Sequence, residues 1–467
     1  MSENEQLYLG GEICTMDPSQ PTANALAVRS GTIVAVGDEE KCRSVLGHAP
    51  SIISLEGSAL LPGFIDTHLH IPLMVFYELN TDLSRIRSES ELRTVLNESI
   101  LALDADQWAV GLQFDESQLN MSNQTDRHYL DAISRKHPLI LIRRDGHSLI
   151  ANSAAMQIAG ITSSTPDPQG GMIHRNADRV PTGVFRETAM SIILDKVPFP
   201  ELDAITKAAE AVFTSITAQG ITSVGTILQT GEEGISGKLG AFDIPLMELL
   251  LDKTPFNLYS LLVTNDPAGI NALRQSSLHV ANLGHGPRIG GMKFWADGSF
   301  GSRTAFLEQP YNDAPGERGF MIHSMENMKR RMLEAHLAGE QIAIHSIGDA
   351  STRICLELFK QLLHKHPNQD IRHRIEHASQ LSSELIETIS ELNLIVATQP
   401  MFIQSEKAWL KDRLGKERIK WTYPFRSLIE AGVTVSGASD APVESLDVMQ
   451  SIENCVARED FEPQQSI

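Results

Sequence analysis

Eight short apolar runs constrain the fold more than any other feature of this 467-residue sequence. Each run ends in polar residues and precedes a stretch of helical character, which is the pattern of parallel β/α units. The runs cover residues 61–68, 221–226, 257–263, 289–297, 341–346, 372–378, 394–400 and 434–440. Because eight such units close a barrel, we predict an α/β fold of the (β/α)8 TIM type.

The segments outside these runs predict two additions to the barrel. Residues 1–60 carry short alternating stretches between Gly and Asp-Pro turn signals, which is typical of a small β module. The gap at about 75–215 is too long for a loop and holds strand-like pieces at 108–114 and 139–145. We therefore predict a β-sandwich module at 1–60, and a barrel over 61–467 whose inserted α+β subdomain covers the C-terminal mouth.

The charge balance disfavours several classes of partner. A formal net charge of −20 opposes binding to nucleic acid or to an anionic membrane, because both require a basic face. The sequence shows no signal-like N-terminus and no apolar segment long enough to cross a bilayer, and its 4 cysteines form no CxxC pair. We expect a cytoplasmic protein that binds a small molecule, with neither nucleic acid nor a membrane as partner.

Histidines and an aspartate stand at the ends of the predicted strands. His68 and His70 are two residues apart, so their side chains share one face of the first strand. His345, His377 and Asp440 end later runs, at the rim where barrel enzymes keep their catalytic groups. Each residue alone is more often structural, and Asp440 would also serve as a helix cap. Their coincidence at one rim favours a metal site.

Lys293 lies inside the apolar run IGGMKFWAD, where an ammonium group is costly to bury without a partner. Two explanations remain open from the residues alone. An acid such as Asp297 would neutralise the lysine, or the neutral amine would take up CO2 and form a carbamate. The carbamate is an anionic ligand that bridges two metals.

Four further residues are weaker candidates for orienting metal ligands or substrate, since metal-bound groups usually need supporting hydrogen bonds. Structural roles are equally compatible with their positions. These candidates for the substrate site are His147, Asn152, Asp297 and Arg303. Aromatic residues near the rim favour a pocket for a partly hydrophobic compound, although packing is their commoner role. They are Phe294, Trp295, Phe300 and Phe402.

Several motifs resemble those of the metal-dependent amidohydrolase superfamily. They are LPGFIDTHLH, MKFWADGSFGSRTA, AIHSIGD, RIEHA and SDAPVE. The branch that contains N-substituted formamide deformylases is the most similar, since RRDGHSLIANSAAM and GGMIHR with PTGVFRETAM resemble its insertion. The resemblance covers residues 7 to about 458.

The resemblance implies a binuclear centre with two divalent metal ions. Its residues would be His68, His70 and Asp440 for the more buried ion, His345 and His377 for the more exposed ion, and Lys293, as its CO2-derived carbamate, for the bridge. Such nitrogen and oxygen ligands fit zinc, as well as manganese, iron or cobalt.

The resemblance also implies that the N-terminal module is half of a composite β-sandwich. Members of the family continue beyond the eighth strand with further strands, whereas this sequence stops at EDFEPQQSI. We therefore expect an incomplete sandwich. Its open strand edges would favour association, with a homodimer as one form.

The activity implied is hydrolysis of a C–N bond, other than a peptide bond, in a small amide or N-formyl amine. A metal-bridging hydroxide would attack the carbonyl, while Asp440 takes the proton and passes it to the departing amine. Opening of a cyclic amide or deamination of a ring on the same metals is an alternative. A non-catalytic role, as in family members that bear the name of exoenzyme regulators, is another, but the intact ligand set argues against it.

Overall fold

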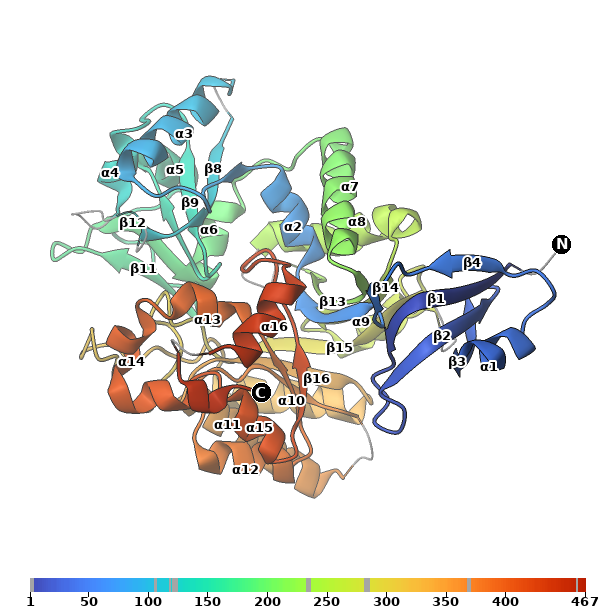
Figure 1. The fold of residues 1–467 in the computed structure, drawn as a ribbon. Coiled ribbons are helices and arrows are strands. Elements are labelled where there is room, and N and C mark those ends of the chain that lie inside the picture. Colours follow the sequence, from blue (N-terminus) through green and yellow to red (C-terminus); the bar gives the residue numbers. More distant parts are fainter. Residues whose placement is uncertain are drawn as a thin grey trace. The chain divides into compact units, whose positions relative to one another are not determined.

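The computed structural model describes residues 4–104, 107–116, 119, 125–231, 237–280, 286–367, 371–458 and 461–467. The chain forms two compact units, Met1–Phe64 and Ile65–Ile467 (Figure 1). Among the described residues, no helix combines the length and the hydropathy needed to span a bilayer.

The first unit is built on a five-stranded sheet in the order β3-β2-β1-β4, with β5 also paired to β1. Its elements are β1 (Glu5–Cys14), β2 (Thr22–Arg29), β3 (Thr32–Gly37), α1 (Glu39–Ser44), β4 (Ser51–Ser54) and β5 (Ala59–Leu60). Helix α1 buries Cys42 against Leu7, Ala25 and Ala27 of β1 and β2. The composite β-sandwich stays a prediction.

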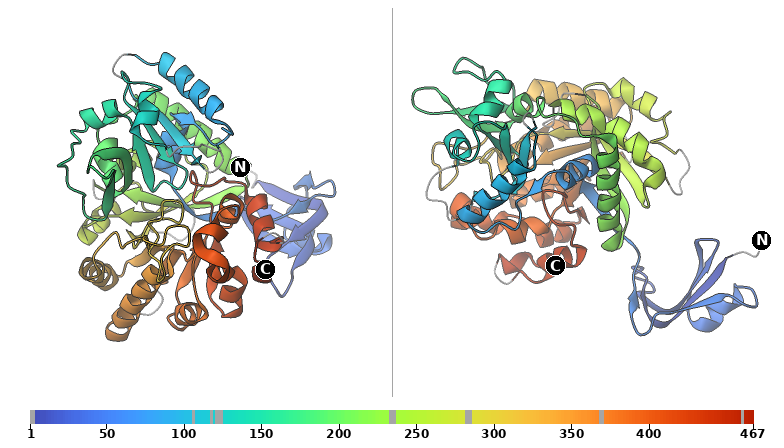
Figure 2. Two further views of the ribbon diagram at one scale, coloured as in Figure 1. Left: turned by 90° about the vertical axis from the view of Figure 1, so that its left-hand side faces the viewer. Right: turned by 90° about the horizontal axis from the view of Figure 1, so that it is seen from above.

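An eight-stranded sheet in the order β19-β18-β17-β16-β15-β14-β13-β6 forms the centre of the second unit (Figure 2). The strands are β6 (Phe64–Leu69), β13 (Ile221–Gln229), β14 (Asn257–Val263), β15 (Pro287–Trp295), β16 (Gln341–Ser346), β17 (Arg374–His377), β18 (Ile395–Thr398) and β19 (Thr434–Gly437). The pairs from β13 to β19 are parallel. Each predicted run overlaps one of these strands, which confirms the expected barrel sheet.

Hydrogen bonds connect the first strand of this sheet to the last. Thr67 donates through Oγ1 to the carbonyl of Gly437, at 2.9 Å. The backbone N–H of Asp440 donates to the carbonyl of His68, at 2.8 Å. Strands β6 and β19 are therefore adjacent, and the sheet is nearly closed into a barrel.

Helices follow the strands, as a β/α barrel requires. They include α2 (Ile71–Glu78), α7 (Leu202–Ala218), α8 (Asp243–Leu250), α9 (Pro267–Leu273), α10 (Met325–Leu337), α11 (Asp349–Lys365), α12 (Ser383–Glu391), α13 (Met401–Glu406), α14 (Leu410–Arg418), α15 (Phe425–Glu430) and α16 (Val448–Val456). In α11 the apolar residues Cys355, Phe359 and Leu362 recur at helical spacing and are buried, so this stripe faces the protein interior.

A second, six-stranded sheet lies between β6 and β13 in the sequence and has the order β11-β12-β10-β9-β8-β7. Its elements are β7 (Thr81–Asp82), α3 (Glu89–Leu101), β8 (Ala109–Phe114), α4 (Arg127–Asp131), β9 (Leu139–Arg143), β10 (Ser148–Ala151), α5 (Ser153–Ile158), β11 (Gly171–Arg175), β12 (Pro181–Glu187) and α6 (Ser191–Leu194). Strands β8 and β9 confirm the two strand-like pieces expected at 108–114 and 139–145.

Both faces of this sheet are covered. Ile140 and Ile142 of β9 pack into one apolar cluster with residues of α5 and α6. Leu139 and Leu141 pack into another with residues of α3 and α4. Because neighbouring strand residues point to opposite faces, the continuous run LILI supplies both layers.

Candidate metal centre

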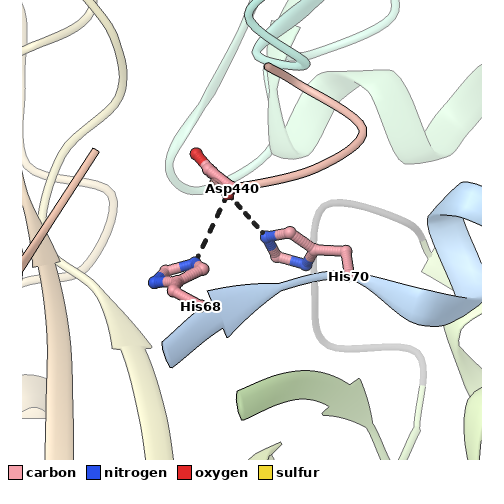
Figure 3. A group of neighbouring side chains, drawn as sticks. All are labelled: His68, His70 and Asp440. Carbon is pink, nitrogen blue, oxygen red and sulfur yellow. Dashed lines mark hydrogen bonds and ion pairs between the residues drawn. The ribbon is translucent and has the colours of Figure 1, made fainter. Parts of the chain in front are cut away.

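His68, His70 and Asp440 form the tightest group of candidate ligands (Figure 3). Nε2 of His70 lies 3.1 Å from Oδ1 of Asp440, and Nε2 of His68 lies 3.4 Å from the same oxygen. One ligand atom from each residue falls within 4.8 Å of the other two. Imidazole nitrogens and a carboxylate oxygen at this spacing could hold a divalent metal ion.

His345 and His377 extend this group along the ends of β16 and β17. Their rings are 4.4 Å apart between centroids, and the ring of His377 is 5.2 Å from that of His68. His377 has φ 72 and Asp440 has φ 61, a left-handed backbone that is uncommon for residues other than glycine. Such strain is often retained at functional sites, and here it occurs at two candidate ligands.

Burial keeps the histidines of this group in the form that binds metals. It lowers the pKa of His68 to about 4 and that of His377 to about 3. Burial also holds the pKa of His345 well below its usual value. Near neutral pH these imidazoles therefore keep a free lone pair. Burial would raise the pKa of Asp440, but the neighbouring histidines hold it well below its usual range, so it is a carboxylate.

Lys293, on β15, lies beside these ligands with only 1% of its surface exposed. Within the described part of the chain, its Nζ has no hydrogen-bond partner. Burial lowers the pKa of Lys293 to about 8, although the carboxylates of Glu376 and Asp440 oppose the shift. A buried amine without a partner, partly neutral near pH 7, fits reaction with CO2, since the carbamate oxygens would be ligands.

The alternative ion pair between Lys293 and Asp297 is not formed. Asp297 accepts hydrogen bonds from the backbone N–H groups of Phe306, Ile347 and Gly348, at 2.8 to 3.0 Å. The Ser351 hydroxyl adds another, at 2.7 Å. Asp297 thus organises loops behind the strand ends, and it does not line the cavity at the ligands.

Buried polar residues that the sequence did not reveal hold the histidine rings. Glu376 accepts a hydrogen bond from Nδ1 of His68 and is also bound by Arg374, at 2.7 and 2.8 Å. Nδ1 of His377 lies 2.7 Å from Oε1 of Gln399. Bonds at Nδ1 leave Nε2 for a metal. A signal was present, because Glu376 and Gln399 are polar residues inside or directly after buried runs.

His147 reaches the same cavity from the loop before β10. Its ring lies 5.2 Å from that of His345, between centroids. Nδ1 of His147 lies 2.7 Å from Oε2 of Glu187, another residue that the sequence did not reveal. Burial would lower the pKa of His147, but the Glu187 carboxylate outweighs it and raises the pKa to about 9.

Two weaker candidates lie elsewhere. Asn152 is the N-cap of α5, and its amide donates to the carbonyls of Ser134 and His137, at 2.8 and 3.0 Å. Arg303 pairs with Asp313, at 2.8 Å. Neither lines the cavity that holds the candidate ligands. Local hydrogen bonds account for the positions of both side chains, and the expectation that they orient substrate stays a prediction.

The cavity has a polar floor and apolar walls. The strand-end residues His68, His70, Lys293, His345, His377 and Asp440 all line it. Its walls include Leu73, Phe76, Leu79, Leu194, Phe199, Phe242 and Leu246. Of the four aromatic residues expected here, only Trp295 contributes; Phe294 and Phe300 are buried elsewhere, and Phe402 faces another cavity. The aromatic walls come instead from α2 and the segments around α7 and α8.

A barrel with clustered imidazoles, a carboxylate and a buried lysine at its strand ends has the form of a metal-dependent hydrolase. The chain belongs to the amidohydrolase family, which it matches over residues 51–465. This membership confirms the family predicted from the motifs, and it supports a hydrolase.

Individual relatives agree with this membership. The Bacillus subtilis (strain 168) protein named "Putative amidohydrolase YtcJ" is 32% identical over 456 residues, which cover 97% of this chain and 83% of that one. The N-substituted formamide deformylase of Arthrobacter pascens is 24% identical over 465 residues, covering 97% and 83%. An uncharacterized metal-dependent hydrolase from Pyrococcus horikoshii, solved as a crystal structure, shares the fold, with a TM-score of 0.74, 23% identity and coverage of 99% and 89%.

Proposed function

We propose that this protein is a metal-dependent amidohydrolase that cleaves a C–N bond, other than a peptide bond, in a small amide or N-formyl amine. The observation that carries the proposal concerns Lys293, which is buried among histidines and Asp440 in the cavity. Its Nζ has no hydrogen-bond partner among the residues that the structure describes. The similarity to an N-substituted formamide deformylase supports the substrate class. A cavity with apolar walls and a few convergent polar groups suits a small molecule rather than nucleic acid or a membrane.

The candidate ligands divide into two groups that share Lys293. The residues proposed to hold the ions are His68, His70 and Asp440 for one, His345 and His377 for the other, and carboxylated Lys293 for both. Zinc is the ion we propose, because the ligands are imidazoles and carboxylates. Bound ions would polarise the substrate carbonyl and lower the pKa of a water molecule.

Asp440 is the proposed catalytic residue. Its Oδ1 is the oxygen near His68 and His70, and Oδ2 accepts no hydrogen bond from the residues that the structure describes. Asp440 would take a proton from the attacking water and return it to the nitrogen as the C–N bond breaks. Water is thereby divided between the products, an acid and an amine.

The first experiment measures metal content in protein purified without chelator. We expect about two metal ions per chain in the wild type. Lys293→Ala should lower this number, whereas Lys253→Ala, which removes an exposed lysine paired with Glu210, should not. Carbon-13 bicarbonate should give a carbamate signal in the wild type that is lost in Lys293→Ala. Equal metal content in both variants, without such a signal, would refute the bridging role.

The second experiment measures turnover of 4-nitroformanilide and other simple amides, with a cyclic imide and an aminopyrimidine for the alternative reactions. Asp440→Asn should lower the rate by roughly 100- to 10000-fold. Asp349→Asn is the control, because Asp349, the first residue of α11, accepts hydrogen bonds from the backbone N–H groups of Glu308 and Ala350 and is absent from the cavity lining. If the protein converts only the cyclic imide or only the aminopyrimidine, the corresponding alternative reaction would replace the proposed amide hydrolysis. If the protein contains metal but hydrolyses none of these compounds, the result would favour the non-catalytic, regulatory role.

A further inference from the structure

The inserted sheet contributes a hydrogen-bonded pair to the cavity, His147 and Glu187. His147 precedes β10 and Glu187 ends β12, two strands that pair antiparallel. The backbone N–H of Glu187 donates to the carbonyl of His147, at 3.0 Å. Since Nδ1 of His147 also lies 2.7 Å from Oε2 of Glu187, backbone and side chains join the two residues.

Glu187 combines a buried carboxylate with a strained backbone conformation. It is 0% exposed, and its φ of 52 falls in the left-handed region. Among the described residues, its ion-pair partner is His147, and its second oxygen accepts a hydrogen bond from Thr304. Burying a carboxylate and straining the backbone both destabilise a fold, so their retention together points to a functional role.

The surroundings of His147 fix its ring at the cavity. Its backbone N–H donates to Oδ1 of Asp145, at 3.1 Å. Oδ2 of Asp145 accepts from the hydroxyls of Ser299 and Ser302, both at 2.6 Å, so the loop is tied to the segment after β15. With Nδ1 engaged by Glu187, Nε2 is the ring nitrogen left for another molecule in the cavity.

We propose that His147 forms a hydrogen bond through Nε2 with the amide group that is cleaved, and that Glu187 is its positioning residue. The inference rests on the proposed function and deepens it. The substrate amide would then be held between the strand-end ligands of the barrel and a side chain of the inserted sheet. The insertion would be part of the active site as well as a cover for it.

The test compares His147→Asn, Glu187→Gln and the double variant, using 4-nitroformanilide as the probe. His174→Asn is the matched control, because His174 lies in the same sheet, bonds to Thr182 and is absent from the cavity lining. We expect kcat/KM to fall roughly 100-fold or more in His147→Asn. It should fall about 10-fold or more in Glu187→Gln.

The double variant decides whether Glu187 acts through His147. If it does, Glu187→Gln has no further effect once His147 is replaced. Additive losses would overturn the positioning role. An unchanged kcat/KM in His147→Asn would overturn the proposed hydrogen bond between His147 and the substrate amide. Loss of bound metal in that variant would overturn it as well. Circular dichroism checks folding, and His147→Asn alone decides the contact if Glu187→Gln is misfolded.

Equilibrium binding of benzamide separates this inference from the proposed function. We expect binding to weaken in His147→Asn and to be unchanged in His174→Asn. If the wild type cleaves no amide but shows this binding pattern, the proposed function fails while the contact with an amide stands. A wild type that neither binds benzamide nor cleaves an amide overturns both.

Discussion

Glu376 on β17 accepts a hydrogen bond from Nδ1 of His68 on β6, although 308 positions separate the two residues in the sequence. Burial would raise the pKa of Glu376, but Arg374 and His68 hold it well below its usual range. A carboxylate at Nδ1 fixes the tautomer of the ring and makes Nε2 a better ligand. The bond across the barrel therefore prepares His68 for a metal.

Replacing Glu376 by Gln should weaken metal binding by about 10- to 100-fold, because the amide no longer makes His68 more basic. Competition with a chelator measures the affinity. Glu340→Gln is the matched control, since Glu340 is also buried and pairs with Arg274, at 2.6 Å. Equal losses in both variants would indicate a general effect on the fold and contradict the role of Glu376.

Asn152→Ala should lower the free energy of unfolding by about 1–2 kcal/mol, because it removes the side-chain cap of α5. Metal content and kcat/KM should not change, since Asn152 does not line the cavity. Urea unfolding and amide turnover measure the two properties. A fall in kcat/KM with unaltered stability would support Asn152 as a substrate-binding residue.

In the metal-free protein, His323 and His373 should each lower the free energy of unfolding as the pH falls from about 6.5 towards 4. Burial lowers the pKa of His373 to about 3 and that of His323 to about 4, below the value of 6.5 expected in the unfolded chain. In this window the unfolded state binds more protons at these two histidines, so each of them favours unfolding in acid. Buried carboxyl groups whose pKa is raised by burial, such as Asp243 and Glu406, act in the opposite direction. The slope is at most about 1.4 kcal/mol per pH unit for each such group.

Urea unfolding at several pH values measures this slope, and His323→Gln should reduce it. Burial of His68 and His377 shifts their pKa values in the same direction, so these residues add to the effect. The same slope in His323→Gln and in the wild type would contradict the prediction.

Phe199→Ala should raise KM for 4-nitroformanilide by about 2- to 10-fold, the equivalent of one aromatic contact. Phe199 stacks on Phe242 at 4.1 Å between ring centroids, and both line the cavity. Formamide, which has no ring, serves as the control substrate and should keep its KM. If KM changes equally for 4-nitroformanilide and formamide, Phe199 and Phe242 do not recognise the ring of the substrate.

The sequence predicted the barrel well because each strand carries its own signal. The runs 257–263 and 341–346 coincide with β14 and β16. The predicted strand ends were less accurate where the backbone stops pairing with the neighbouring strand. The last run was expected to reach Asp440, but β19 ends at Gly437, since Asp440 turns into the left-handed region.

The candidate site, like the fold, was predicted in part. The six expected ligands line one cavity, because strand ends meet at one rim, while their metal roles stay a prediction. Hydrogen bonds between residues far apart in the sequence could not be predicted from the spacing of residues. Glu376 bonds to His68 on another strand, and Glu187 bonds to His147, which directly precedes the strand paired with β12. Asn152 stands directly before SAAM at the start of α5, where an asparagine is a local signal for an N-cap.

The seam between β6 and β19 has a consequence for protein synthesis. Asp440 is made 370 residues after His70, its partner across the seam. At roughly 5–20 residues per second, the ribosome takes about 20–75 s to cover this distance. Two histidines therefore leave the ribosome long before the carboxylate that completes their group, so this site is assembled among the last parts of the barrel.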